Sequence, residues 1–161
     1  MQRLVIGFVV GGVLGTGFGF AVGILVFPYL FPPPEVNEPL EGKTEREVVA
    51  HATFIHANPA DPIHYGRGTA TLYDDLVRLE PDFEVGPGPK FHVYLVPLSE
   101  VTADTEVERT MFVDLGRLKS FAGSQNYPVP EGTDLADFGS VVIWCEQFNV
   151  LISPAAISFA E

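Results

Sequence analysis

The sequence predicts an all-β domain, either an antiparallel β-sandwich or a barrel-like sheet, preceded by one N-terminal transmembrane helix. The helix is predicted by an apolar run from Leu4 to Phe27 that contains no charged side chain. The β domain is predicted from Val48 onward, where short alternating or apolar runs recur between Gly, Pro, Asp and Asn residues. No stretch of about ten residues or more in this part has the apolar stripe of an amphipathic helix. The 161 residues suffice for one such core beside an anchor.

The apolar run is long enough to cross a membrane. At ~1.5 Å per residue, a helix from Leu4 to Phe27 would reach about 36 Å, and the hydrocarbon core of a bilayer is ~30 Å thick. A cleaved signal peptide is the alternative, but its apolar region usually has about 7–15 residues and ends at small residues. This run is longer and leads into Phe27-Pro28-Tyr29. We therefore expect an uncleaved membrane anchor in residues 4–27.

The charge beside the anchor predicts its orientation. Arg3 is the only charged side chain before Glu35, and basic residues stay on the cytoplasmic side of a membrane. We therefore expect a single-pass protein of the cell membrane with its C-terminal domain outside the cytoplasm. Glycine recurs at every fourth position of the anchor, at Gly7, Gly11, Gly15, Gly19 and Gly23. Such a face permits close helix packing, so a homo-oligomer formed through it is a further expectation.

The composition excludes several classes of protein. The chain has 9 Lys and Arg residues against 21 Asp and Glu residues, a net charge of −12, whereas nucleic-acid binding needs clustered basic side chains. Its one cysteine excludes an intrachain disulfide, a CxxC zinc knuckle and a CxxCH haem attachment. The sequence contains no GxSxG motif, the pattern that would indicate a serine hydrolase. The four histidines form no HExxH or HxH pair, so their spacing predicts no metal site.

Three segments are predicted along the chain: an anchor in residues 1–31, a Pro/Glu-rich linker in residues 32–47 and the β domain in residues 48–161. The linker begins with three consecutive prolines, which favour an extended, semi-rigid spacer. The strands expected in the β domain are Val48–His56, Gly68–Tyr73, Leu76–Leu79, Phe91–Val96, Phe112–Leu118, Val141–Cys145 and Val150–Ile152.

Cys145 is the residue of greatest chemical interest. It ends a predicted strand in which Ile143 and Cys145 would share one face and Trp144 would lie on the other. A lone thiol outside the cytoplasm is uncommon, because such thiols tend to oxidise. It could be a redox thiol, a ligand for haem or a metal, or half of an intermolecular disulfide. The alternative is a buried, inert thiol that packs as a small hydrophobic residue.

A series of short motifs follows the predicted strands in a characteristic order between Val49 and Phe159. The most specific is Ser140-Val141-Val142-Ile143-Trp144-Cys145-x-x-Phe148-x-Val150. The others are Thr53-Phe54, His64-x-Gly66-x-Gly68-Thr69-Ala70, Leu79-Glu80-x-x-Phe83, Gly88-Pro89-x-x-x-Val93-Tyr94-Leu95, Val113-Asp114-Leu115-Gly116-x-Leu118-Lys119, Gly123-x-Gln125-x-Tyr127-x-x-Pro130 and Ala155-Ala156. In this order they resemble the DM-thirteen domain family, also called the electron-transfer DM domain, as found in membrane-anchored bacterial proteins. Two positions depart from the family pattern: Ala52 replaces a glycine, and Lys90 replaces an acidic residue.

The resemblance implies a mostly β domain with a redox role in which Cys145 is a thiol or a ligand for a prosthetic group such as haem. An axial haem ligand would need a partner such as His64, His92 or Met111. Of these, only His64 lies in a matched segment, so it is the first choice. Trp144 and Tyr127 would line the site, or would pack the core. Such a protein would transfer electrons to a redox partner rather than act as an enzyme.

Two functions are therefore expected. The first is a membrane-anchored, extracytoplasmic domain with a redox, electron-transfer or haem-binding role centred on Cys145. The second is a non-catalytic binding or structural module of the cell envelope in which Cys145 is buried and inert. The first function implies a redox partner, and the second implies a contact with another protein of the envelope.

Overall fold

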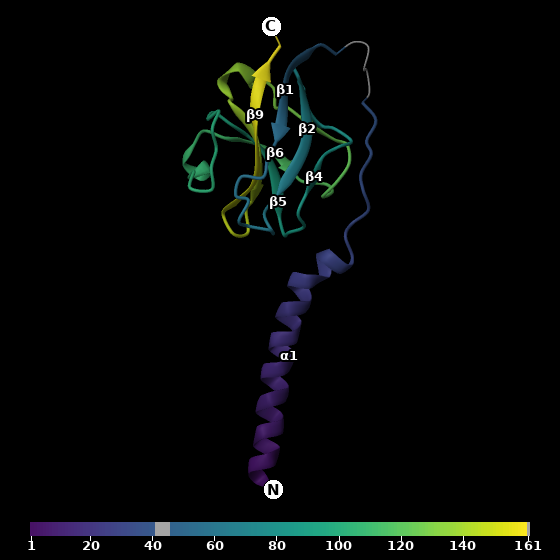
Figure 1. Ribbon diagram of the computed structural model, residues 1–161, viewed down its shortest axis with the longest axis vertical. Coiled ribbons are helices and arrows are strands. Elements are labelled where there is room, and N and C mark those ends of the chain that lie inside the picture. Colours follow the sequence, from purple (N-terminus) through teal and green to yellow (C-terminus); the bar gives the residue numbers. More distant parts are fainter. Residues whose placement is uncertain (41–45, 161) are drawn as a thin grey trace. The chain divides into compact units, whose positions relative to one another are not determined.

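The N-terminal segment forms one long helix, α1 (Gln2–Leu30), which the computed structural model shows as a unit separate from the β domain (Figure 1). The structure describes residues 1–40 and 46–160, and the two units are Met1–Pro33 and Pro34–Glu161. Helix α1 is long and apolar enough to cross a membrane, and a signal sequence near the N-terminus would have the same length and composition. No acidic residue lies in its first turn and no basic residue in its last, so side chains of the helix do not neutralise the partial charges of the helix dipole.

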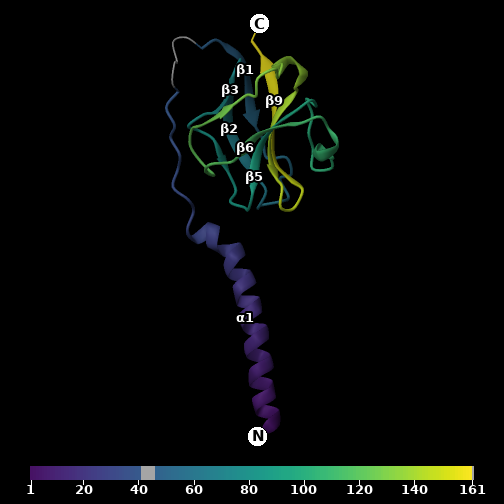
Figure 2. The ribbon, with the colours of Figure 1, turned by 180° about the vertical axis from the view of Figure 1, so that it is seen from behind.

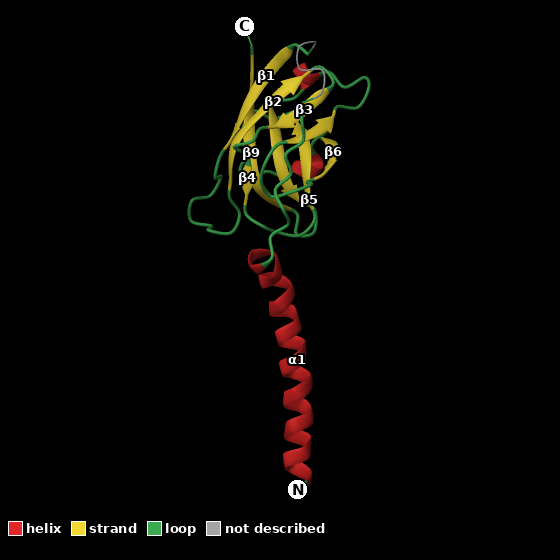
Figure 3. Cartoon of the chain, turned by 90° about the vertical axis from the view of Figure 1, so that its right-hand side faces the viewer, coloured by secondary structure: helices red, strands yellow, loops and turns green. Residues whose placement is uncertain are grey.

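In its described residues, the second unit contains nine strands and two short 3₁₀ helices. The strands are β1 (Val48–Phe54), β2 (Gly66–Tyr73), β3 (Leu76–Leu79), β4 (Glu84–Val85), β5 (Phe91–Val96), β6 (Val113–Arg117), β7 (Gln125–Pro128), β8 (Ser140–Cys145) and β9 (Val150–Phe159). The 3₁₀ helices are η1 (Val107–Arg109) and η2 (Leu135–Asp137). Figure 3 shows these strands in yellow and α1 in red.

The strands form one antiparallel sheet in the order β6-β5-β8-β9-β1-β2-β3-β7, with β4 paired to β2. The sheet curves until its end strands β6 and β7 lie near each other, so that it becomes a nearly closed barrel (Figure 2). The prediction of an all-β, barrel-like domain after one apolar helix is therefore confirmed. Only full closure removes the edges of a sheet, so β6 and β7 remain end strands.

Two hydrophobic clusters lie on opposite faces of β8. The barrel interior contains Phe83, Phe91, Ile143 and Cys145 among its buried members. The outer cluster packs Trp144 of β8 with neighbours from β5 and β9 and with two valines of the β5–β6 connection. This division follows from the alternation of side chains along β8, and it confirms that Cys145 and Trp144 face opposite ways.

Two glycines in strands have positive φ angles but different surroundings. Gly68 in β2 has φ +100°, and a Cβ there would lie 2.5 Å from the backbone O of Asp82 and from the Cα of Phe83. Gly116 in β6 has φ +118°, and a Cβ there would meet nothing within 4 Å. Gly68 therefore permits both a rare backbone conformation and a close approach of two segments, whereas Gly116 permits only the first.

Part of the predicted linker, from Pro34 to Pro39, is hydrogen-bonded to the barrel. Residues 34–39, here called the strap, lie beside residues 120–126. The N–H of Val36 donates to the O of Ala122 (3.3 Å), and the N–H of Glu38 donates to the O of Ser124 (2.9 Å). The remaining part of the predicted linker includes residues 41–45, which lie outside the described residues.

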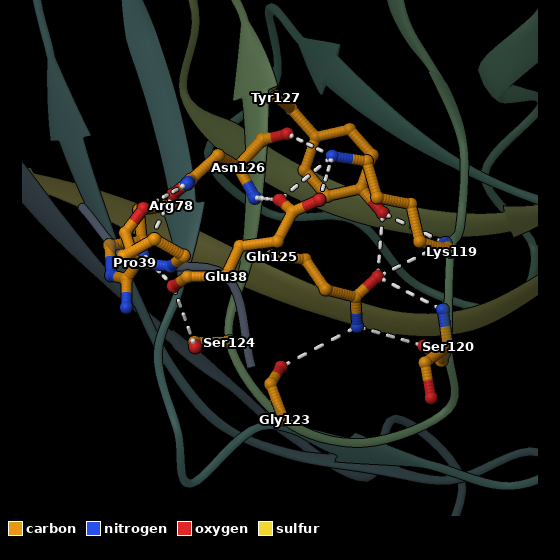
Figure 4. A network of polar contacts seen from close by, with 10 residues as sticks. All are labelled: Glu38, Pro39, Arg78, Lys119, Ser120, Gly123, Ser124, Gln125, Asn126 and Tyr127. Carbon is orange, nitrogen blue, oxygen red and sulfur yellow. Dashed lines mark hydrogen bonds and ion pairs between the residues drawn. The ribbon is translucent and has the colours of Figure 1, made fainter. Parts of the chain in front are cut away.

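The Glu38 side chain connects the strap to the edge of β7 (Figure 4). Its carboxylate accepts hydrogen bonds from the Lys119 Nζ at 2.8 Å and from the N–H of Asn126 at 2.7 Å. Lys119 Nζ also donates to the O of Asn126 at 2.8 Å. The backbone O of Glu38 accepts from Arg78 and from the Ser124 hydroxyl. Both backbone groups of Asn126 on this edge are therefore bonded to side chains.

Acid is expected to loosen the strap through protonation of Glu38. Burial alone would raise the pKa of Glu38, but hydrogen bonds from Lys119 and Asn126, with the charges of Lys119 and Arg78, outweigh it and lower this pKa below 4.5. Because the folded-state pKa is depressed, the stabilisation is complete above about pH 4.5 and is lost as the pH falls through the lower folded-state value.

The measurement is hydrogen exchange of the Asn126 amide in the full-length protein. Glu38→Gln should speed this exchange roughly fivefold at neutral pH, the factor for about 1 kcal/mol. It should also remove the additional opening of the strap that acid causes in the parent protein. Glu35→Gln is the matched control, because Glu35 is exposed in the same strap. Equal exchange rates in the two variants would contradict this role of Glu38.

Candidate functional site

Cys145 lies in the barrel interior at the end of β8. It pairs with Phe91 of β5 on one side and with Val150 of β9 on the other. Its side chain belongs to the interior hydrophobic cluster, and the residue is 1% exposed. Its thiol donates a hydrogen bond to the backbone O of Pro89 at 3.3 Å. Pro89 belongs to the turn that precedes β5, so one rigid turn covers the sulfur. Cys145 is thus a buried thiol that is hydrogen-bonded to the backbone.

The turn over Cys145 fits closely against the end of β5. A Cβ at Gly88 would lie 2.3 Å from the Phe91 ring, so a larger residue could not occupy this position without a shift. The Phe91 ring in turn packs edge-on against Phe121, with centroids 5.9 Å apart. Flanking prolines restrict the turn further, because each proline fixes its own φ angle. The turn over Cys145 therefore packs tightly against the Phe91 ring, which itself contacts Phe121.

Trp144 does not share a site with Cys145. Its side chain lies on the outer face of β8, where the residue is 4% exposed among the members of the outer cluster. Its indole Nε1 has no hydrogen-bond partner among the residues that the structure describes. A buried N–H without a partner usually costs about 1–3 kcal/mol. The prediction that Trp144 lines a site together with Cys145 is not supported by this placement.

His64 lies in the loop between β1 and β2, where it binds Asp61. The Nδ1 atom of His64 is 2.6 Å from the Asp61 carboxylate. This hydrogen bond, together with those from the N–H groups of Ile63 and His64, lowers the pKa of Asp61 to about 2. Within residues 1–40 and 46–160, no hydrogen bond or ion pair joins His64 to Cys145. The structure therefore gives His64 a role in ordering its own loop.

Tyr127 belongs to a buried polar network in the wall of the barrel. Its hydroxyl donates to the Oε1 atom of Gln125 at 2.8 Å and accepts from the N–H of Lys119 at 3.1 Å. The same Oε1 accepts from the N–H groups of Lys119 and Ser120, and the Nε2 atom donates to the O of Ser120 (Figure 4). Burial raises the pKa of Tyr127 far above its usual value. Tyr127 therefore orders residues 119–127 as a neutral phenol.

The surroundings of Cys145 do not fit a haem. The sulfur atom donates to a backbone carbonyl, and the interior cluster encloses it. His92 is the histidine nearest to Cys145 along the paired strands, but its side chain points to the outer face, as that of its partner Trp144 does. His64 is bonded to Asp61 and His92 faces outward, so neither is placed to ligate an iron together with this sulfur.

A second group of titratable side chains lies on the outer face of β5, β6 and β8. His92 Nδ1 is 3.0 Å from Asp114 Oδ2, and His92 Nε2 is 3.5 Å from Glu146 Oε2. One ligand atom from each of these three residues lies within 4.8 Å of the others. The sequence alone did not indicate this group, because the residues are distant in the chain. The group could have been found only from the strand order β6-β5-β8, and the spacing of residues along the chain does not show this order.

Comparison with known proteins identifies the family. The model of the family described as Electron transfer DM13 matches residues 60–157, more than half of the chain, including His64, Tyr127, Trp144 and Cys145. No curated protein and no solved structure matches the chain. The match agrees with the order of motifs between Val49 and Phe159. The chain therefore belongs to the Electron transfer DM13 family.

Proposed function

We propose that this chain is a membrane-anchored electron-transfer protein whose β domain lies outside the cytoplasm and whose redox group is the thiol of Cys145. Membership of the Electron transfer DM13 family is the observation that supports this most. Cys145 is the only cysteine of the chain and lies within the matched region. The apolar helix α1 supports the membrane location, and Arg3 at its start supports the orientation.

Access to the sulfur would come from local opening at one end of the barrel. Cys145 is the last residue of β8, and the exposed residues Gln147 and Phe148 follow within the β8–β9 hairpin. Because the thiol is bonded to the O of Pro89, a reagent would reach the sulfur from this end when the Pro89 turn moves. Turns and hairpins open at lower free energy than strands in a core. A partner would therefore meet the thiol between the Pro89 turn and the hairpin.

The redox step is a thiol–disulfide exchange with a partner disulfide. The Cys145 thiol gives its proton to water, and its sulfur attacks one sulfur of the partner. The partner S–S bond breaks, a mixed disulfide forms, and the second partner sulfur leaves as a thiolate that takes up a proton. In the reverse reaction the partner thiolate attacks the mixed disulfide, the partner S–S bond re-forms, and the electron pair returns to the sulfur of Cys145.

The second candidate is a non-catalytic module of the cell envelope. The 1% exposure of Cys145 and its hydrogen bond to Pro89 favour this function, because they describe a thiol that packs as a core residue. In that case Cys145 would contribute only to stability. The two candidates differ in whether the folded protein lets its thiol react.

Glutathione disulfide, as the probe, is expected to form a mixed disulfide with the folded, full-length protein in detergent micelles. Mass spectrometry follows the adduct over time at several low urea concentrations. If local opening gives access, the rate should not depend on urea below the unfolding transition. Gln147→Cys in a Cys145→Ser background is the accessible control and should react at the rate of a free thiol.

The opposite result is also informative. If Cys145 reacts only as the protein unfolds globally while the Gln147→Cys control reacts at once, the thiol is inert in the folded state. The proposed redox role of Cys145 would then be wrong, and the envelope-module function would replace it.

A further inference from the structure

We propose that His92, Asp114 and Glu146 bind a divalent first-row transition-metal ion, of the Zn²⁺ and Cu²⁺ class, on the outer face of the barrel. This site is separate from Cys145, whose side chain lies in the interior. It uses one imidazole and two carboxylates, a donor set that suits such ions. Its presence does not depend on whether Cys145 is redox-active.

Three adjacent strands bring the ligands together. His92 of β5 pairs with Trp144 of β8 and with Arg117 of β6. A register shift in β6 between the partners of Val93 and Tyr94 brings Asp114 beside the histidine. Glu146 follows β8 directly, and its N–H donates to the O of Lys90 at 3.2 Å, which fixes the start of the hairpin. The ligands therefore come from strands of a rigid sheet and from the first residue after one of them.

The ligand atoms lie near one another, but as a group they are farther apart than around a bound ion. His92 Nδ1 is 3.0 Å from Asp114 Oδ2, His92 Nε2 is 3.5 Å from Glu146 Oε2, and all three ligand atoms lie within 4.8 Å of one another. Around a tetrahedral ion with bonds of about 2.0–2.1 Å, neighbouring ligand atoms lie roughly 3.3 Å apart. The two ring nitrogens of His92 face different carboxylates, so binding requires a rotation of the ring and a contraction of the group.

Both carboxylates are already oriented by hydrogen bonds from outside the group. The Tyr94 hydroxyl donates to Glu146 Oε1 at 3.0 Å, and the N–H of Gly116 donates to Asp114 Oδ1 at 2.8 Å. Glu146 keeps its other oxygen, Oε2, toward His92, and both oxygens of Asp114 lie near His92 Nδ1, at 3.1 and 3.0 Å. Hydrogen bonds from Lys90 and Tyr94 lower the pKa of Glu146, so it is ionised near neutral pH. Such supporting contacts typically contribute 10- to 100-fold to metal affinity.

Lys90 competes with the ion. Its Nζ atom is 2.9 Å from Glu146 Oε2, and its side chain is 54% exposed. The ammonium group can swing into solvent when a doubly charged ion arrives, because few contacts hold an exposed lysine stem. Removal of this positive charge should therefore strengthen metal binding. Lys90 thus offers a variant that acts in the opposite direction to loss of a ligand.

Trp144 provides a built-in reporter for the test. It is the only tryptophan of the chain, and it pairs directly with His92 across β5 and β8. Bound Cu²⁺ quenches nearby indole emission. Titration of CuCl₂ into the full-length protein in micelles should therefore give saturable 1:1 quenching that EDTA reverses. Calorimetric titration with ZnCl₂ measures the affinity without the copper probe.

The variants separate this site from adventitious binding. His92→Gln and Asp114→Asn should each weaken Cu²⁺ and Zn²⁺ binding by about tenfold or more, and Lys90→Ala should tighten it several-fold. His51→Gln is the matched control, because His51 is an exposed histidine of β1, and it should bind as the parent does. Circular dichroism confirms that each variant is folded.

Two results would overturn the proposal. One is equal metal affinity in the parent and in His92→Gln. The other is that Lys90→Ala leaves binding unchanged while His51→Gln weakens it. Neither result bears on thiol exchange at Cys145, so this proposal and the redox proposal fail separately.

Discussion

Replacing Gly68 with alanine is expected to prevent stable folding of the barrel, whereas the same replacement at Gly116 should leave it folded. Both glycines have positive φ angles, for which an L-residue costs roughly 1–2 kcal/mol. Only at Gly68 would the new methyl group lie 2.5 Å from the backbone of Asp82 and Phe83. Backbone atoms cannot move aside as a flexible side chain can. The total loss at Gly68 should therefore be on the order of 4 kcal/mol or more.

Urea unfolding of the full-length protein in micelles, followed by Trp144 fluorescence, measures this difference. Trp144 is buried, so its emission should change when the barrel opens. Gly116→Ala should lower the free energy of unfolding by only ~1–2 kcal/mol. Similar losses for the two variants would show that the close approach of β2 to residues 82–83 does not determine the stability of the barrel.

Replacing Gln125 with leucine should be the second strongly destabilising change. Gln125 is fully buried, and its side chain bonds the N–H groups of Lys119 and Ser120, the Tyr127 hydroxyl and the O of Ser120. Leucine has a similar size but leaves these buried groups without that partner. With about 1–3 kcal/mol for each unsatisfied group, partly offset by the remaining bond between Lys119 and Tyr127, the loss should be roughly 3–4 kcal/mol.

Gln147→Leu is the matched control for this change. Gln147 lies exposed in the β8–β9 hairpin, so the same replacement there should alter the free energy of unfolding by less than about 0.5 kcal/mol. Thermal unfolding followed by circular dichroism compares the two variants. A Gln125→Leu protein as stable as the control would mean that water replaces the lost hydrogen bonds.

Much of the fold could be predicted because most strands bury a regular apolar pattern. The structure contains a strand at each of the seven predicted places, and β3 and β5 have the expected bounds. β7 was not predicted, because Gln125-Asn126-Tyr127-Pro128 has no apolar alternation. It is a strand because the inward side chains of Gln125 and Tyr127 satisfy each other while the backbone pairs with β3. β9 continues past Ile152 through Pro154, where the sequence suggested an end.

The candidate sites were harder to predict, because they depend on which strands become neighbours. Alternation along β8 correctly separated Cys145 from Trp144. The assignment of His64 as a partner for Cys145 came from their presence in one family pattern, and such a pattern does not specify contacts. The grouping of His92 with Asp114 and Glu146 requires β6, β5 and β8 to lie side by side. The order of strands is a property of the tertiary structure, and local sequence motifs do not specify it.

The strap has a further consequence for the association of copies of this protein. A strand at the end of a sheet can pair with a strand of another molecule and so begin aggregation. On β7, the N–H of Asn126 is bonded to Glu38 and its O to Lys119. One ion pair therefore blocks the edge at which a second sheet would add. A fragment that begins at Val48 would lack Glu38, and we expect it to aggregate. A fragment that begins at Pro34 should remain monomeric under the same conditions.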